Sequence, residues 1–172
     1  MTLVSAARLL DSPAEEAFDR LTRLAARLLG APVALVTLAG DGRVFFKSAV
    51  GLPEPWASRR STPLSYSFCR HVIASGEALV VEDARRHPLV RTSPAIRELR
   101  WVAYAGVPVT VSGGSTAGAL CVIDALPRLW SPRDIALLED LAAFVATEIE
   151  LRGVESPPAG DPAAEVFDAT AL

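Results

Sequence analysis

The 172-residue chain is long enough for one domain with a sizeable core, because 51% of its residues are hydrophobic. Its net charge of −3 and its lack of a basic tract exclude the common nucleic-acid-binding classes, and no apolar run approaches the ~20 residues that cross a bilayer. Two cysteines are too few for a disulfide scaffold or a cysteine-only metal site, so we expect a cytoplasmic protein without a metal, a membrane anchor or a nucleic-acid partner.

The first predicted helix follows a short, partly apolar lead-in at residues 1–11. In Ser12-Pro13-Ala14-Glu15, the serine can cap a backbone N–H, the proline suits the first helical position, and the glutamate completes a capping box. Gly30 suits the left-handed position that ends a helix. Between them, apolar residues recur at helical spacing, at Phe18, Leu21, Leu24, Ala25 and Leu28.

The middle of the chain alternates short extended runs with loops. Residues 33–39 and 44–50 flank a Gly-Asp-Gly turn and predict a β-hairpin. Residues 51–66 hold several prolines and predict an irregular loop. The remaining predicted elements are a short helix at 67–75, a strand at 79–81, an Arg-rich loop at 83–94 and a helical turn at 95–99.

Two longer apolar runs, 101–110 and 116–124, are joined by a Gly-rich turn and predict neighbouring strands that form the floor of a cavity. A helix follows from Ser131 to about Arg152. The Pro- and Ala-rich residues 153–172 have no core face, so we expect them to be disordered. These elements predict an α+β domain over residues 12–152, with the terminal helices on one face of a sheet and a loop-covered pocket on the other.

Alternation along the last strand predicts which of its side chains lie together. Cys121 shares a face with Ala119 and Ile123, whereas Asp124 points to the opposite face. A redox pair between Cys121 and Cys69 requires their Cα atoms to lie within about 7 Å. We interpret Cys69 as a small core residue, and the lone lysine, Lys47, as a strand residue whose ammonium group reaches solvent.

A set of aromatic and polar side chains is predicted to line the pocket. The aromatic residues suit planar ligands, although a core also needs them. Asp83 directly follows a strand, where pocket rims form, and Asp124 either contacts a ligand or caps the following turn. The predicted ligand-binding residues are Phe46, Ser67, Phe68, His71, Asp83, Trp101, Tyr104, Cys121 and Asp124. The sequence predicts no catalytic residues.

The last predicted helix carries apolar residues on two sides. One stripe contains Ile135, Leu138, Ala142, Val145 and Ile149, and the other contains Leu137, Leu141 and Phe144. One stripe can pack on the sheet, and the other would then face water. We therefore expect a homodimer through the first and last helices, unless the first helix covers both stripes within one chain.

Five segments, taken in order and spacing, resemble the GAF domains of bacterial signalling proteins over about residues 8–152. The likeness is to GAF domains attached to histidine kinases, diguanylate cyclases or serine phosphatases, and it implies a five- or six-stranded antiparallel sheet, small-ligand sensing and helix-mediated dimers. The segments are Leu10-Asp11-Ser12-Pro13, Phe45-Phe46-Lys47-Ser48 with Gly51-Leu52, Ser67-Phe68-Cys69-Arg70-His71, Val80-Val81-Glu82-Asp83-Ala84, and Tyr104-Ala105-Gly106-Val107-Pro108 with Gly118 through Asp124.

The chain departs from three better-defined GAF subgroups. It lacks the Asn-Lys…Phe…Asp-Glu spacing of the cyclic-nucleotide binders. Residues 95–100 contain no cysteine, so a covalently bound bilin is not expected, and no other cofactor is identified. Free methionine sulfoxide reductases need several closely placed cysteines, and the two cysteines here lie far apart in sequence.

The leading hypothesis is a stand-alone GAF-type sensory domain that binds a small molecule and signals through its terminal helices to a separate partner. The first alternative is a thiol-dependent reductase of a small oxidised metabolite, with Cys69 or Cys121 as the nucleophile; full burial of both thiols would argue against it. The second is a dimerisation module whose vestigial pocket is filled by side chains.

Overall fold

A six-stranded antiparallel sheet forms the centre of the fold, in the order β3-β2-β1-β6-β5-β4. The computed structural model describes residues 2–154. The strands are β1 (Val33–Gly40), β2 (Arg43–Val50), β3 (Ser61–Pro63), β4 (Leu79–Val81), β5 (Ala103–Thr110) and β6 (Thr116–Asp124). Five of them lie where the sequence predicts strands, and β3 lies within the segment predicted as an irregular loop.

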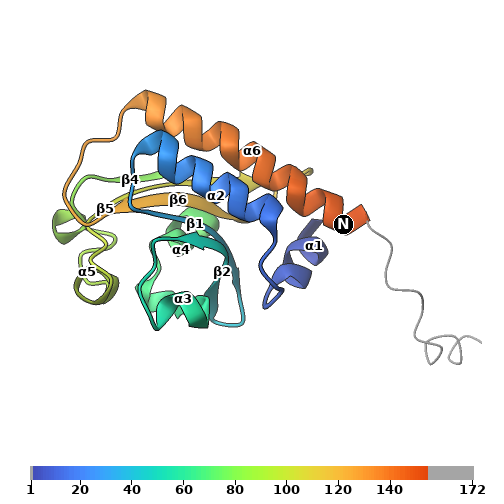
Figure 1. Cartoon of the computed structure of the whole chain (residues 1–172), viewed down its shortest axis with the longest axis horizontal. Helices are drawn as coiled ribbons and strands as arrows, with labels where there is room; N and C mark the ends of the chain where they lie inside the picture. The colour runs from blue at the N-terminus through green and yellow to red at the C-terminus, as the bar shows by residue number, and fades with distance from the viewer. Residues whose placement is uncertain (1, 155–172) are drawn as a thin grey trace, which may run out of the picture.

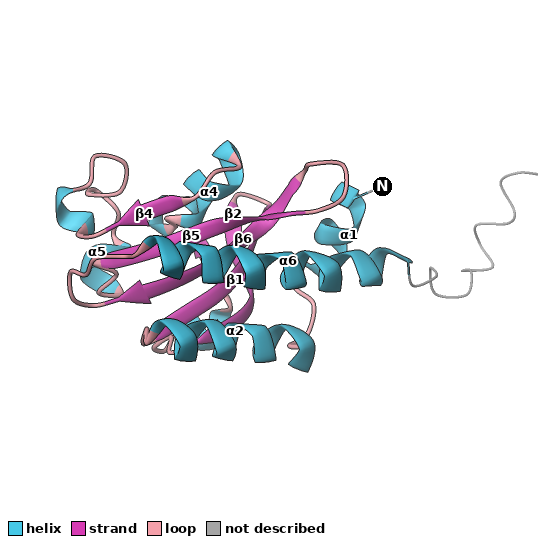
Figure 2. Cartoon of the chain, turned by 90° about the horizontal axis from the view of Figure 1, so that it is seen from above, coloured by secondary structure: helices cyan, strands magenta, loops and turns pink. Residues whose placement is uncertain are grey.

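The described residues form six helices, which pack on the two faces of the sheet. They are α1 (Thr2–Leu9), α2 (Glu16–Leu29), α3 (Trp56–Arg59), α4 (Cys69–Ser75), α5 (Ala95–Glu98) and α6 (Pro132–Val154), with 3₁₀ turns at Leu64–Tyr66 and Ala84–Arg86. The predicted lead-in therefore contains a helix, α1, and of the predicted tail the part from residue 155 onward lies outside the described residues. The long helices α2 and α6 lie side by side across one face of the sheet (Figures 1 and 2).

The central strands bury apolar side chains on both faces, so both faces need a cover. On one face, Val107, Leu120 and Val122 pack against α2 and α6. On the other, Tyr104 and Cys121 pack beneath α4, α5 and the loops. The α+β architecture and the position of the terminal helices on one face are thus confirmed.

The predicted capping box at the start of the first helix is wrong. Helix α2 begins at Glu16, and Glu15 precedes it in an extended conformation. The Ser12 hydroxyl donates to the Leu9 carbonyl at 2.6 Å, which caps the end of α1, and it accepts a hydrogen bond from Lys47 at 2.7 Å. Ser12 therefore caps the end of the preceding helix, α1, and does not cap the start of α2 as predicted.

Lys47 is fully buried and does not reach solvent, contrary to our interpretation of the sequence. Its ammonium group donates to the Pro13 carbonyl at 2.7 Å and pairs with the carboxylate of Glu15. That same carboxylate accepts from Arg152 of α6 at 2.8 Å. A buried charge persists only when it is paired and hydrogen-bonded, so this Lys47–Glu15–Arg152 network ties strand β2 to the start of α2 and the end of α6.

Lys47 and Arg152 also lower the pKa of Glu15. Partial burial raises the pKa of Glu15, but the hydrogen bonds and charges of Lys47 and Arg152 outweigh it and hold this pKa below its usual value of 4.5. The contribution of Glu15 to the free energy of unfolding is therefore complete above about pH 4.5 and is lost as the pH falls through the lower, folded-state value.

We predict that Glu15→Gln lowers the free energy of unfolding by about 2 kcal/mol at pH 7, because it leaves the buried Lys47 without its counter-charge. The matched control is Glu16→Gln, which removes only an exposed pair with Arg23 and should change the free energy of unfolding much less than Glu15→Gln does. Urea unfolding measures both. The difference between wild type and Glu15→Gln should shrink in acid, and a difference that stayed constant down to pH 3 would contradict this account.

Candidate functional site

Most of the predicted ligand-binding residues lie in the core beneath the loops. All six of these side chains have less than a tenth of their surface exposed: Phe46, Ser67, Phe68, Trp101, Tyr104 and Cys121. The Phe68 ring meets Trp101 and Tyr104 edge-on, with ring centroids 5.8 and 5.4 Å apart. These side chains fill the space that the sequence predicts as a pocket, so a ligand there would have to displace packed side chains.

A thiol–hydroxyl cluster lies at the centre of this face. The Tyr104 hydroxyl lies 3.0 Å from the Cys69 Sγ, and the Sγ atoms of Cys69 and Cys121 lie 3.5 Å apart. Cys121 is paired with Gly106 across the β5–β6 ladder. A Cβ at Gly106 would lie 2.1 Å from the Tyr104 hydroxyl oxygen, so only glycine there lets the tyrosine lie along its own strand.

Burial and hydrogen bonding act in opposite directions on this cluster. Burial raises the pKa of Tyr104 and of Cys121 well above their usual values. Burial also raises the pKa of Cys69, but hydrogen bonding with Cys121, Thr37 and Tyr104 outweighs it and leaves that pKa lowered. Cys69 is therefore the thiol of the pair whose pKa is lowered, although it is almost completely enclosed.

The remaining predicted residues lie apart from this core. His71 is half-buried on α4, beside a shallow depression of about 430 Å³ that it shares with Leu64 and Arg70. Burial and the neighbouring Arg70 lower its pKa. Asp124 accepts from the Leu126 N–H at 3.2 Å and faces Arg128 at 3.4 Å, which is the turn-capping arrangement.

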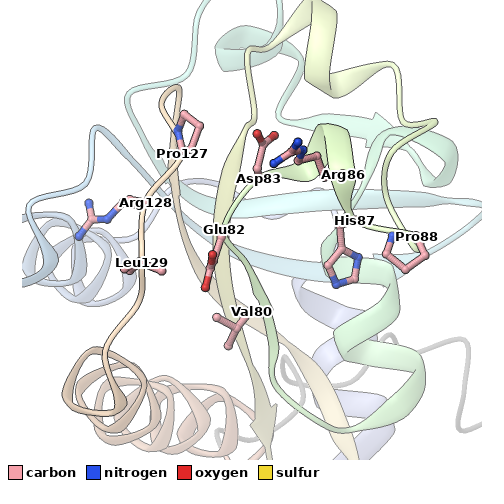
Figure 3. A pocket seen from close by; sticks show the side chains of 9 residues that line it. All are labelled: Val80, Glu82, Asp83, Arg86, His87, Pro88, Pro127, Arg128 and Leu129. Carbon is pink, nitrogen blue, oxygen red and sulfur yellow. The ribbon is translucent and has the colours of Figure 1, made fainter.

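Asp83 lies on the rim of an open pocket of about 570 Å³ at the β4 edge of the sheet (Figure 3). Its carboxylate caps the following 3₁₀ turn by accepting from the Arg85 N–H, and it pairs with the Arg85 guanidinium at 2.8 Å. Hydrogen bonding from Arg85 lowers the pKa of Asp83. The pocket is lined by Val80, Glu82, Asp83, Arg86, His87, Pro88, Pro127, Arg128 and Leu129.

Polar groups of both signs line this pocket, and the Arg86 side chain lies beside Asp83, whose pKa its positive charge helps to lower (Figure 3). The side chains of Glu82 and Arg86 are exposed and make no hydrogen bond or ion pair with any described residue. His87 accepts from the Leu89 N–H at its Nδ1, which leaves Nε2 to donate. Arg86 belongs to the Arg-rich segment that the sequence predicts as a loop at 83–94, and the fold places it in the same pocket as Glu82.

Residues 127–129 form the opposite wall and connect β6 to α6. The Arg128 side chain points away from Glu82 (Figure 3) and donates to the carbonyls of Leu29 and Gly30, at 2.7 and 3.2 Å, at the end of α2. Its backbone N–H donates to the Glu82 carbonyl at 3.2 Å. Next to it, the Trp130 indole donates to the Val81 carbonyl of β4 at 3.1 Å. One short segment thus joins the pocket to both long helices.

The sequence did not predict a functional role for this connecting segment. Its one local signal is the Pro-Arg-Leu-Trp run between a strand and a helix start, and the contacts that give it importance are to residues about 100 positions earlier. Residues 2–154 contain no group of three or more histidine, cysteine or acidic side chains arranged to hold a metal ion. Within that same range no helix has both the length and the apolar character needed to cross a membrane.

Comparison with known proteins agrees with this fold. The chain is 34% identical over 143 residues to the cyclic di-GMP phosphodiesterase PA2567 of Pseudomonas aeruginosa, covering 82% of this chain but only 24% of that protein. The GAF domain of a phosphoenolpyruvate-protein phosphotransferase from Acinetobacter superposes with a TM-score of 0.67 at 20% identity, covering 88% of this chain and 92% of that one.

A free methionine-R-sulfoxide reductase from Neisseria meningitidis, solved with its substrate, gives a TM-score of 0.64 at 17% identity, with 88% of each chain covered. At such identities these two structures share the fold with this chain. The family model described as "GAF domain" matches residues 13–149, which is most of the chain. The protein therefore belongs to the GAF domain family, whose members are in general sensory or regulatory.

Proposed function

We propose that this GAF domain is a sensory module that binds a small zwitterionic molecule, such as an amino acid, in the pocket of Glu82, Arg86 and His87. The observation that carries the proposal is the wall formed by residues 127–129, because that wall leads directly into α6. Arg86 and His87 suit the acid group of such a ligand, and Glu82 suits its ammonium group. The six buried residues that were predicted to bind a ligand, from Phe46 to Cys121, would pack against the sheet and would not contact the ligand.

The same wall supplies a route for the signal. A ligand lodged between Glu82 and Leu129 would compete with the Arg128–Glu82 backbone hydrogen bond and shift the segment that holds the end of α2. A ligand changes the balance between two helix arrangements only through contacts that differ between them. In this proposal those contacts are the hydrogen bonds from Arg128 to the Leu29 and Gly30 carbonyls. The output would pass through α2 and α6 to a separate partner.

The outer faces of α2 and α6 favour an assembly through these helices. Of the predicted stripe Leu137, Leu141 and Phe144, only Phe144 is exposed, because Leu141 is buried and Leu137 packs against the core. Phe144 and Leu151 are 61% and 53% exposed on α6, and Leu28 is 54% exposed on α2. Exposed apolar residues on two adjacent helices are typical of a protein–protein interface. The outer face of α2 also presents Arg20 and Arg27, which complement Glu139 and Asp140 on α6 of a second copy, so a homodimer is the assembly that we propose.

A thiol-dependent reductase is supported less well. The match to the cyclic di-GMP phosphodiesterase spans only 24% of that protein, so its activity does not carry over to this chain. The reductase structure is 17% identical and shares only the fold with this chain. Cys69 and Cys121 are 2% and 0% exposed, so a metabolite cannot reach either thiol in this conformation. A nucleophile that attacks a bound substrate needs an accessible thiolate.

The ligand proposal predicts that Arg86→Ala abolishes the thermal stabilisation of the protein by a zwitterionic metabolite. The measurement is a thermal-shift screen of the twenty amino acids at 5 mM, followed by calorimetric titration of any that raise the melting temperature. Arg86→Ala should weaken binding by tenfold or more, roughly the 1.5–3 kcal/mol of a charged hydrogen bond. Arg91→Ala is the matched control, because Arg91 is exposed on the same loop but does not line the pocket. Binding that is equal in both variants would contradict the assignment.

The assembly proposal predicts that Phe144→Glu weakens dimerisation by at least tenfold, because it places a charge at the centre of an apolar interface. Sedimentation equilibrium across a concentration series measures the dissociation constant. Leu126→Glu, at a 71% exposed position away from both helices, should leave that constant unchanged. A monomeric wild-type protein at 100 μM, or equal effects of the two substitutions, would rule out this interface.

A further inference from the structure

The thiol pair beneath α4 is a second site, separate from the pocket and from the outer faces of the helices. We propose that Cys69 and Cys121 form a reversible disulfide when the protein meets hydrogen peroxide. Such a bond would link α4 covalently to the central strand β6. This inference does not depend on the ligand proposed above, so either can fail alone.

The two sulfur atoms are already close to bonding distance. They lie 3.5 Å apart, and a disulfide bond is about 2.05 Å long, so an approach of about 1.5 Å is enough. Cys121 is fixed in the middle of β6, between Leu35 of β1 and Gly106 of β5. Cys69 is the first residue of a seven-residue helix, so α4 is the element that would move.

Tyr104 favours Cys69 as the sulfur that reacts first. Its hydroxyl lies 3.0 Å from the Cys69 Sγ and can donate to a thiolate there. Gly106 keeps that hydroxyl in place, because any larger residue would collide with it. Tyr104 is thus a positioning residue that acts on the reactivity of Cys69.

The oxidant must enter by a local opening, since neither thiol is exposed in the closed form. The outer side of α4 faces solvent at Arg70, Ala74 and Ser75, and the helix ends at Gly76. Short peripheral helices open at much lower free energy than the whole domain unfolds, and hydrogen peroxide is little larger than water. A bulky metabolite would not gain the same access.

The chemistry balances with one peroxide for each pair. The Cys69 thiolate attacks one peroxide oxygen, the O–O bond breaks, and the released hydroxide takes a proton to become water, leaving a sulfenic acid on Cys69. The sulfur of Cys121 then attacks the Cys69 sulfur, loses its proton and displaces a second water. Two thiols are oxidised to one disulfide, one peroxide is reduced to two waters, and a dithiol reverses the change.

The test uses the wild-type full chain, which contains only these two cysteines. The reduced protein is treated with hydrogen peroxide at neutral pH, denatured, and labelled with N-ethylmaleimide before its intact mass is measured. Untreated protein should take two labels and treated protein none, with a linked Cys69–Cys121 peptide and a single-chain band on a non-reducing gel. Dithiothreitol should restore both labels.

Three results would overturn the proposal. The first is retention of both labels after a treatment that oxidises glutathione in the same tube, and the second is a disulfide found only between chains. The third is oxidation of Cys69 to a sulfinic acid in wild-type protein without a disulfide. Cys121→Ala is the matched variant, and it should trap the Cys69 sulfenic acid for labelling with dimedone.

Tyr104→Phe separates the positioning role of the tyrosine from a merely structural one. Without the hydroxyl, disulfide formation at pH 7 should slow by about three- to tenfold and should recover as the pH is raised, because the Cys69 thiolate loses its donor. A rate lowered equally at every pH, or an unchanged rate, would show that the hydroxyl does not act on Cys69. Circular dichroism confirms folding of each variant.

Discussion

The central strands β1, β6 and β5 bury both of their faces, and this constraint determines where the molecule can bind anything. Helices α2 and α6 cover one face, and a second layer of side chains around Phe68 and Tyr104 fills the other. Interiors packed at this density leave little room for a ligand. Open space lined by charged residues lies outside this packed core, and one such pocket is at the edge of the sheet, where β4 meets the connection between β6 and α6.

That edge is also where the two long helices are held. Arg128 binds the last carbonyls of α2, and Trp130 fixes the start of α6 to β4. At the far end of the same helices, Glu15 joins Arg152 to the buried Lys47. The helix pair is therefore fastened to the sheet at both ends by polar contacts, and the end at Arg128 adjoins the pocket in which we propose that a ligand binds.

Much of this arrangement could be predicted from the sequence, because it rests on local signals. The bounds of β4 and β6 follow from their apolar runs, and alternation placed Cys121 and Asp124 on opposite faces. Contacts between distant residues could not be predicted in this way. Ser12 is a residue type that often caps the start of a helix, but here it bonds to the end of α1 and to Lys47. The short distance between Cys69 and Cys121 depends on how α4 packs against β6.

The central claim is that residue 128 couples the pocket to both helices, and hydrogen–deuterium exchange of wild type and Arg128→Ala tests it most directly. The account predicts faster exchange in the last turn of α2 and the first turns of α6, with α4 unchanged. The side chain of Arg128 holds the Leu29 and Gly30 carbonyls, and its guanidinium lies 4.1 Å from the centre of the Trp130 ring next to the start of α6. Faster exchange confined to residues 125–129, with both helices as protected as in wild type, would contradict it.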